Sequence, residues 1–567
     1  MSDVKKIFLN VCCVLVFFVA TPITLRAQTA GSPPLESIDA LRQLQQQRWL
    51  EQAEREQQRS QPGVVVEAAA ETQDEPDSPA GLNCVSVRAI EWLGSQRDRI
   101  ELAPHLRDIP WLAQLPACLS APEIERRIAD LNQRLRQTGL ITSRVIPARP
   151  VWDDGLLRLQ LIAGRIEAYQ RPSELPQAML NTLFPQTDSV LNLRQLEQSL
   201  DIVNRLRSFR LRLELQPGQQ PGGSVVALKL QRGDALGISH RFDNSGSAQL
   251  GQLRWQLAAD WDAPLGHGLF FSASVSGDLE SRGEDAAFQS RQWHLDYARG
   301  NWHLDWDALH SQSSQRLSGL PVRVLSETDQ SLYQARLTRL LYRDHRRIWR
   351  SAVKLEHSNT KYELAGRELA HSGAASALAA ELSLLSYVKR GYWQARIERQ
   401  WGQSWWGADS DPQAGGPDPG YRRWRLQLSA LQQLPEGWLW RGQLLWQSTE
   451  DRLPSAQQLS LGGPSILRSD DSGILSGDKG VWMSHLLQGP ALADSPLRPQ
   501  LVWDWGRLRD QRAGWRSASS AGVGFTARSR RDHWQLAYHH RLHGPDNDVN
   551  DGDQWRFQWQ RHWRELP

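Results

Sequence analysis

The sequence has no long hydrophobic run after its first 27 residues. Near the start, two lysines precede an apolar run from Ile7 to Ala20, which ends close to the small-residue site Leu25-Arg26-Ala27. A run of about 14 apolar residues is short for a bilayer span, which needs about 20. We therefore predict a cleaved secretory signal over residues 1–27, with a short N-terminal anchor as the alternative. Because no later segment is apolar enough, a membrane-embedded mature chain would have to be a closed barrel.

Cysteine is also scarce, with four residues in a chain of 567. Cys12 and Cys13 lie in the predicted signal, which leaves Cys84 and Cys118. In an exported protein a disulfide between these two is the default expectation. A metal site would need more ligands than His105, which lies between them, so we predict no metal.

The chain lacks a strong charge bias and the common catalytic motifs. Its 66 Lys and Arg nearly balance its 63 Asp and Glu, giving a net charge of +3, which argues against a nucleic-acid surface. It contains no nucleotide-binding G-x-x-x-x-G-K-[ST], no His-Glu-x-x-His and no G-x-S-x-G. We therefore predict neither an enzyme nor a cofactor.

Tryptophan, in contrast, is abundant, with 26 residues, and it recurs in segments of period two after residue 233. Apolar residues alternate with polar ones in four examples: Leu253, Trp255, Leu257, Ala259, Trp261; Trp302, Leu304, Trp306, Ala308; Trp424, Leu426, Leu428, Ala430; and Trp555, Phe557, Trp559. In a transmembrane barrel the apolar face meets lipid and the polar face lines a wet lumen, whereas in a soluble sandwich the polar face lies outside. At about 20 residues per strand and connection, residues 233–567 accommodate around 16 antiparallel strands.

The region before residue 233 divides into four parts. Residues 34–60 show the spacing of one amphipathic helix, and residues 61–81 are an acidic linker rich in Val, Ala and Pro. Two α+β units follow, at 82–164 and 165–232. In the first, a strand over Cys84–Trp92 precedes a helix that the capping box Ser120-Ala-Pro-Glu123 opens and Gly139 closes, and strands follow at Thr142–Ile146 and Leu156–Ile162. In the second, helices are expected at Leu175–Leu183 and Leu193–Leu206, and strands at Arg210–Gln216 and Val225–Gln231.

This organisation resembles the two-partner secretion transporters of the outer membrane, which include the haemolysin activators and the filamentous haemagglutinin transporter. Three local matches, each made of two parts, carry the resemblance in the first half of the chain. They are Asn83–Ile90 with Cys118, Ile162–Ile166 with Leu191–Leu200, and Asp243–Ser247 with Asp262–Gly266. The resemblance implies an N-terminal plug helix (34–60), a periplasmic linker (61–81), two periplasmic POTRA domains (82–164 and 165–232) and a 16-stranded outer-membrane barrel (233–567).

A fourth match lies near the end of the chain, in a segment that resembles the family's long sixth extracellular loop. It comprises Leu461-Gly-Gly463, Ile466-Leu-Arg468 and Leu475-Ser-Gly-Asp-Lys-Gly480, with Pro499–Gly506 further on. In the family this loop folds back into the lumen, and its tip arginine pairs with an aspartate on the barrel wall. By position Arg468 is that arginine and Asp504 its partner, while Gly462, Gly463, Gly477, Asp478 and Gly480 belong to the loop motif. Without the resemblance, Arg468 would be taken as an exposed arginine in a turn. The chain departs from the family at Ser469 and Asp470, where a glycine and an aromatic are expected, and this leaves the geometry of the tip open.

The resemblance also implies a function and partners. The protein would recognise an unfolded partner exoprotein through its POTRA domains and pass it through the barrel without nucleotide hydrolysis. The cargo would be an adhesin, a haemolysin or a contact-dependent toxin, and the protein would lie in the outer membrane of a Gram-negative bacterium. Other partners would be outer-membrane lipid and, during biogenesis, periplasmic chaperones and the barrel-assembly machinery. Two alternatives remain open at this stage: an insertase for outer-membrane proteins, and a passive porin-type channel.

Overall fold

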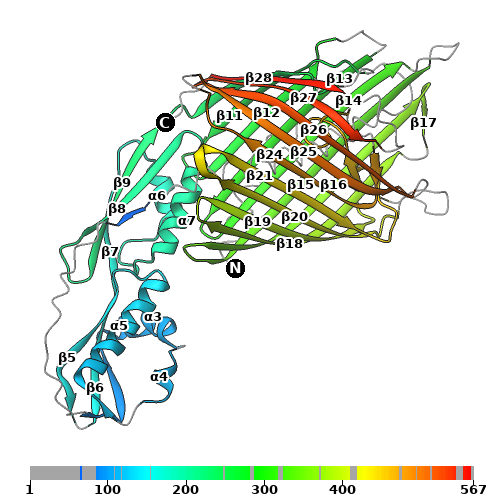
Figure 1. The fold of residues 1–567 in the computed structure, drawn as a ribbon. Helices are drawn as coiled ribbons and strands as arrows, with labels where there is room; N and C mark the ends of the chain where they lie inside the picture. Colours follow the sequence, from blue (N-terminus) through cyan, green and yellow to red (C-terminus); the bar gives the residue numbers. More distant parts are fainter. Residues whose placement is uncertain are drawn as a thin grey trace.

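Two small α+β units stand at one end of a large β-barrel (Figure 1). The computed structural model describes residues 64–66 and 85–563, apart from 108, 116–117, 154, 247–249, 281–285, 317–323, 370–371, 409–417, 471–474, 493–494, 511–513 and 545–552. The predicted signal (1–27), the predicted plug helix (34–60) and Cys84 lie outside the described residues. In the described part of the chain no helix is long and apolar enough to cross a membrane.

The first unit packs two helices against a three-stranded sheet of order β3-β6-β5. Its elements are β2 (Val85–Ser86), β3 (Ala89–Leu93), α3 (Gln96–Leu106), α4 (Pro110–Ala113), β4 (Cys118–Leu119), α5 (Ala121–Gln137), β5 (Arg144–Asp153) and β6 (Leu156–Ile162). The predicted capping box begins α5: the backbone N–H and the hydroxyl of Ser120 each donate to the Glu123 carboxylate at 2.8 Å. Leu131, Leu135 and Leu159 are fully buried in the core that this helix shares with the sheet.

The structure corrects two expectations for this unit. The single strand predicted over Cys84–Trp92 is two strands, because β2 pairs with β4 and β3 pairs with β6. Between them the chain bends, and the backbone N–H of Arg88 donates to the carbonyl of Gly155 at 2.7 Å. The helix α3 was not predicted; Ser95 caps it by accepting a hydrogen bond from the N–H of Asp98 at 3.0 Å.

The second unit is built in the same way around a four-stranded sheet of order β1-β8-β9-β7. Its own elements are β7 (Arg165–Gln170), α6 (Gln177–Leu183), α7 (Leu193–Asn204), β8 (Phe209–Pro217) and β9 (Gly223–Arg232). The fourth strand, β1 (Val64–Val66), comes from the predicted linker and lies parallel to β8, with Val64 opposite Leu213 and Val66 opposite Leu215. The edge of β8 therefore accepts main-chain hydrogen bonds from an added segment.

Sixteen antiparallel strands form the closed barrel, which confirms the predicted fold class. They are β10 (Leu236–Asp243), β11 (Arg254–Asp262), β12 (Leu269–Asp278), β13 (Ala286–Arg299), β14 (Trp302–Arg316), β15 (Leu325–Arg343), β16 (Arg347–Leu364), β18 (Gly373–Val388), β19 (Gly391–Gln403), β20 (Arg422–Gln433), β21 (Leu439–Ser448), β24 (Lys479–Gln488), β25 (Leu497–Asp510), β26 (Gly514–Arg528), β27 (Asp532–His543) and β28 (Gln554–Trp563). The short β17 (Arg367–Glu368) only extends the β16 hairpin. β10 and β28 close the barrel over six register pairs, compared with 17 between β15 and β16.

The two faces of the barrel wall differ as the period-two pattern predicts. On β11, Leu257 and Trp261 point outward and are 45% and 48% exposed, whereas Asp260 and Asp262 point inward and are 7% and 1% exposed. The apolar outer surface suits lipid, and the charged inner surface suits a wet lumen.

The second unit is fixed to the barrel mainly through α7 and the residues after it. On β15, Arg343 contacts Asp201 of α7 at 2.6 Å, and Glu197 of the same helix at 3.4 Å. The backbone N–H of Ser208 donates to Asp262 at 2.6 Å. Because these contacts are buried or half-buried, the unit is held at a defined place on the barrel rim.

Candidate functional site: the lumen and its inward loop

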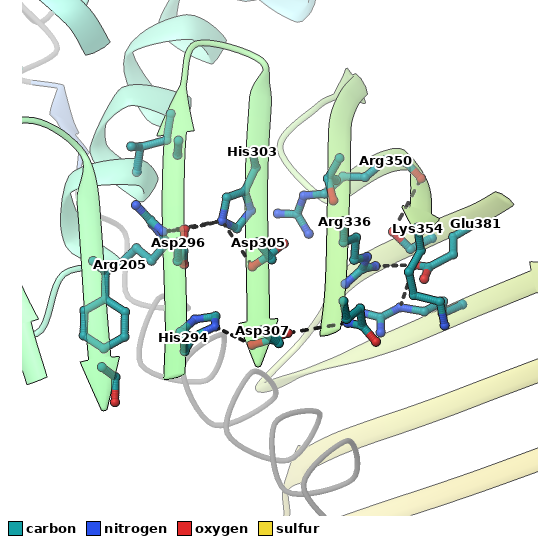
Figure 2. A pocket seen from close by; sticks show the side chains of 18 of the residues that line it. Arg205, His294, Asp296, His303, Asp305, Asp307, Arg336, Arg350, Lys354 and Glu381 are labelled. Atoms are coloured by element: carbon teal, nitrogen blue, oxygen red, sulfur yellow. Dashed lines mark hydrogen bonds and ion pairs between the residues drawn. The ribbon is translucent and has the colours of Figure 1, made fainter. Parts of the chain in front are cut away.

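A cavity at the α7 end of the lumen is lined by charged side chains from α7 and from strands β10 to β20 (Figure 2). On the walls, Lys354 lies 2.6 Å from Glu398, and Arg336 forms an ion pair with Glu381. Opposite charges therefore compensate one another between strands that are separated by one further strand, since β18 lies between β16 and β19, and β16 lies between β15 and β18. The sequence shows only the inward polar alternation, since the pairing depends on the register between strands.

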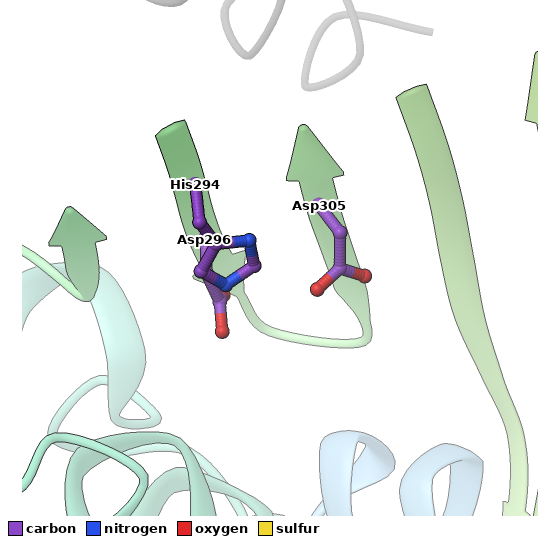
Figure 3. Close-up of side chains that lie close together, drawn as sticks. All are labelled: His294, Asp296 and Asp305. Atoms are coloured by element: carbon purple, nitrogen blue, oxygen red, sulfur yellow. The ribbon is translucent and has the colours of Figure 1, made fainter. Parts of the chain in front are cut away.

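Within this cavity, His294, Asp296 and Asp305 bring one ligand atom each to within 4.8 Å of one another (Figure 3). Such a set could hold a divalent cation. Asp296, however, is already ion-paired with Arg205, which follows α7, and is also bonded to His303. A cation would have to displace that guanidinium, so we assign the cluster to the contact between α7 and the barrel.

The loop between β21 and β24 spans residues 449–478, and its described residues, 449–470 and 475–478, fold into the lumen; it is called the lumen loop here. It contains β22 (Leu459–Leu461) and β23 (Leu475–Gly477), which form a two-stranded sheet. Gln457 in this loop is hydrogen-bonded to Glu356 on β16, and its carbonyl accepts from Arg423 on β20 at 2.8 Å. The loop thus contacts the barrel wall at β20, which neighbours the strand that precedes the loop, and at β16, which lies several strands away.

Arg468 and Asp504, which the resemblance pairs, lie together in the structure. Nη1 of Arg468 is 3.0 Å and 3.1 Å from the two carboxylate oxygens of Asp504, and the backbone N–H of Arg468 is 3.4 Å from one of them. The side chain of Asp504, on β25, is fully buried, and that of Arg468 is 14% exposed. One guanidinium nitrogen reaches both oxygens, whereas the other terminal nitrogen, Nη2, lies 3.5 Å from the Ser484 hydroxyl.

The other loop-motif residues have structural reasons for their identities. Gly462 and Gly463 adopt φ of 104° and 103°, which favour glycine. A Cβ on Gly477 would lie 2.5 Å from the carbonyl of Arg509, and one on Gly480 would lie 2.4 Å from that of Arg507. Asp478 is buried and accepts hydrogen bonds from the N–H of Leu453 and the amide of Gln458, at 3.1 Å and 3.0 Å.

Ser469 and Asp470, which depart from the family pattern, lie in a hydrogen-bonded turn at the tip of the loop. The backbone N–H of Asp470 donates to the carbonyl of Leu467 at 3.0 Å, and Leu467 takes the left-handed conformation with φ of 53°. Ser469 is therefore not the residue that needs positive φ. Sequence reasoning identified Asp470, which is 2% exposed, only as a departure from the family, and it missed the ion pair with Arg541 because that residue is distant in the chain.

Of the two cysteines in the predicted disulfide, the structure describes only Cys118. Cys118 is disulfide-bonded, and Cys84 lies outside the described residues. Ser86 of β2 pairs in register with Cys118 of β4, so the chain after residue 84 runs beside Cys118. The pairing of Cys84 with Cys118 remains a prediction.

Comparisons with known proteins agree with this architecture. The family model described as haemolysin secretion/activation protein ShlB/FhaC/HecB matches residues 222–527, and two POTRA models match residues 103–164 and 164–217. The haemolysin transporter protein ShlB of Serratia marcescens is 29% identical over 84% of this chain and 85% of its own. The outer membrane transporter CdiB of Dickeya dadantii is 25% identical over 93% of each chain. The solved structure of CdiB from Escherichia coli covers 94% of this chain and all of its own, with a TM-score of 0.81 and 21% identity.

The fold and the lumen define an outer-membrane β-barrel transporter with two periplasmic POTRA domains, the first and second units described above. Within that class, the chain belongs to the ShlB/FhaC/HecB family of two-partner secretion proteins, since the family model covers more than half of it. The resemblance inferred from the sequence is therefore confirmed. The family consists of transporters, not enzymes. The exact domain boundaries proposed from the sequence remain predictions.

Proposed function

We propose that this protein recognises an unfolded partner exoprotein through its POTRA domains and translocates it through the barrel to the cell surface, without nucleotide hydrolysis or catalysis of its own. Its relatives are transporters of haemolysin or carry the name of the CdiB transporters, so the cargo belongs to the haemolysin, adhesin or contact-dependent toxin type. Lipid contacts the outer wall, and chaperones and the barrel-assembly machinery act during biogenesis.

The observation that carries the proposal is the paired β1 on the edge of β8. It supports recognition by strand addition, because Val64–Val66 already adds a parallel strand there. Strand addition uses main-chain hydrogen bonds and asks little of the added sequence, which suits an unfolded client. An incoming segment would compete with β1 for that edge.

We further propose that Arg468 and Asp504 lock the lumen loop. If the loop moved and took the Arg468 guanidinium away, the buried Asp504 carboxylate would be left without a charge partner, which is unfavourable. The pair therefore favours the loop position in which both groups are in contact. The charge-compensated walls support passage of a polar extended chain, since they offer hydrogen-bonding groups without a large net charge of one sign.

The first test is planar-bilayer conductance of the purified protein, compared with a variant lacking residues 34–60. If those residues plug the lumen, the shortened protein will form a larger and steadier channel. Equal conductance would remove the plug from the proposal, and absence of conductance from both proteins would contradict an export pore.

The lock is tested by Asp504→Asn, with Glu450→Gln as the matched control. Both changes replace a carboxylate by an amide, but the Glu450 side chain is 85% exposed in its pair with Lys479. We expect Asp504→Asn alone to raise the protease sensitivity of the lumen loop and to lower secretion of the exoprotein encoded with this transporter. Unchanged protease sensitivity would contradict the lock.

A further inference from the structure

The tip of the lumen loop has a second charged contact besides Arg468. The Asp470 side chain is completely buried, and its carboxylate forms an ion pair with Arg541 on β27. Its other oxygen accepts a hydrogen bond from the Ser469 hydroxyl at 2.6 Å. Both residues that depart from the family pattern therefore take part in one contact with the barrel wall.

A second arginine, Arg556 on β28, binds the main chain of the same tip. Its Nε donates to the carbonyl of Arg468 at 3.1 Å, and its Nη2 donates to the carbonyl of Asp470 at 2.5 Å. Its Nη1 donates to the carbonyl of Asn244, just after β10, at 3.0 Å. One buried guanidinium thus joins the tip to both strands that close the barrel.

The position of these contacts on the wall matters. Asp504 lies on β25 and Arg541 on β27, two strands further around, which is a separation of about 10 Å at 4.8 Å per strand. A loop fixed at one point can still rotate about it, whereas a loop fixed at two separated points cannot. The carboxylate is needed for the second point, because a buried arginine facing a neutral side chain would lose its charge partner.

We propose that Asp470 and Arg541 form a second anchor for the lumen loop, and that Arg556 ties this anchor to the junction of β10 and β28. Asp470 is a positioning residue in this scheme. It takes the place of the aromatic side chain expected at this point and fixes the tip by charge instead. The proposal concerns the resting position of the loop, so its test requires no cargo.

The test is hydrogen–deuterium exchange of the full-length protein in liposomes, read at the tip residues 464–470. We expect Asp470→Asn to speed exchange there at least tenfold and Glu450→Gln to leave it unchanged. Heat-modifiable migration in electrophoresis checks that each barrel is folded. If Asp470→Asn fails to fold, Arg541→Gln serves in its place. Exchange at the tip equal to wild type in the folded variant would overturn the proposal.

A double substitution separates a direct pair from two independent effects. Because both single changes break the same contact, Asp470→Asn with Arg541→Gln should exchange no faster than the faster single variant. Additive acceleration would overturn the pair. If Asp504→Asn loosens the tip but Asp470→Asn does not, the second anchor is wrong while the Arg468–Asp504 lock stands.

Discussion

Strands of the POTRA domains and of the barrel both alternate apolar and polar residues. The two regions differ in which of these faces points to the interior. In the POTRA domains the apolar face is inside, and Leu157 and Leu159 on β6 and Leu213 on β8 are completely buried. In the barrel the apolar face is outside, and the inside holds ion pairs such as Lys354–Glu398. Period two therefore identifies a strand with two different faces, but only the surroundings decide which face is the interior. One interior is a close-packed core and the other is a wet conduit.

The largest expected effect is the loss of stability when an interior side chain of a POTRA domain is truncated, compared with truncation of an interior side chain of the barrel. Leu131→Ala should destabilise the first POTRA domain by about 2–5 kcal/mol, because it leaves a cavity in a packed core. Gln292→Ala, which also removes an interior side chain but in the lumen, should change stability by less than about 1 kcal/mol. Urea titration followed by hydrogen exchange in each region measures both, and equal losses would break the comparison.

A smaller effect should separate the two faces of one barrel strand. Val275 and Ser274 are neighbours on β12; Val275 is 36% exposed on the outside, and Ser274 lines the lumen. Val275→Arg should cost about 2–4 kcal/mol, because it places a charge in lipid, and Ser274→Arg should cost much less. The stability of the refolded barrel in lipid measures this difference, and the reverse order would mean that the faces are assigned wrongly.

The junction between the two regions should respond more weakly. Arg343→Gln removes a half-buried contact with α7 and should cost about 1.5–3 kcal/mol of docking free energy, since the lost hydrogen bonds involve charged groups. Arg97→Gln, at the exposed contact of Arg97 with Asp188 between the POTRA domains, should have little effect. Distances between spin labels on α6 and on the barrel rim should broaden only for Arg343→Gln. An unchanged distribution would show that α7 is held by other contacts.

The smallest effect concerns pH and the half-buried His105 on α3 of the first POTRA domain. Burial, together with the nearby Arg134, lowers the pKa of His105 below its ordinary value of 6.5. The folded domain therefore favours neutral histidine, so stability is full above pH 6.5 and declines as the pH falls toward the lowered value. His105→Gln should flatten this decline between pH 7.5 and 5.5 in urea titrations followed at α3. A decline that persists in the variant would assign the pH dependence to another group.

The sequence predicted those parts of the molecule whose signals are local. The bounds of β6, Leu156–Ile162, match the prediction, because Leu157, Leu159 and Leu161 alternate along one strand. The capping box at Ser120 is also local and fixes where α5 begins. The helix α3 was missed, because its sequence is strongly polar and includes Pro104.

The remainder depends on which distant segments become neighbours. The three valines at 64–66 are too short a run to predict a strand, and they form one only because they pair with the distant β8. The contacts of Arg205 with Asp296 and of Asp470 with Arg541 depend on strand register and on the path of a loop. Arg468 and Asp504 were found from the sequence only through resemblance to a family, since nothing local distinguishes that arginine from one in an exposed turn.

The unequal strand lengths have a consequence for the cell surface. β10 has 8 residues and β15 has 19, which correspond to about 27 Å and about 65 Å of extended chain. The described connections at the POTRA end are short, so the extra length lies at the opposite end, where β17 marks the rim (Figure 1). The mouth of the barrel is therefore oblique, with a tall side over β14–β18 and a low side at the junction of β10 and β28. If the barrel exports a polypeptide, as proposed, that chain would emerge toward the low side, and the tall side would shelter it from neighbouring surface molecules.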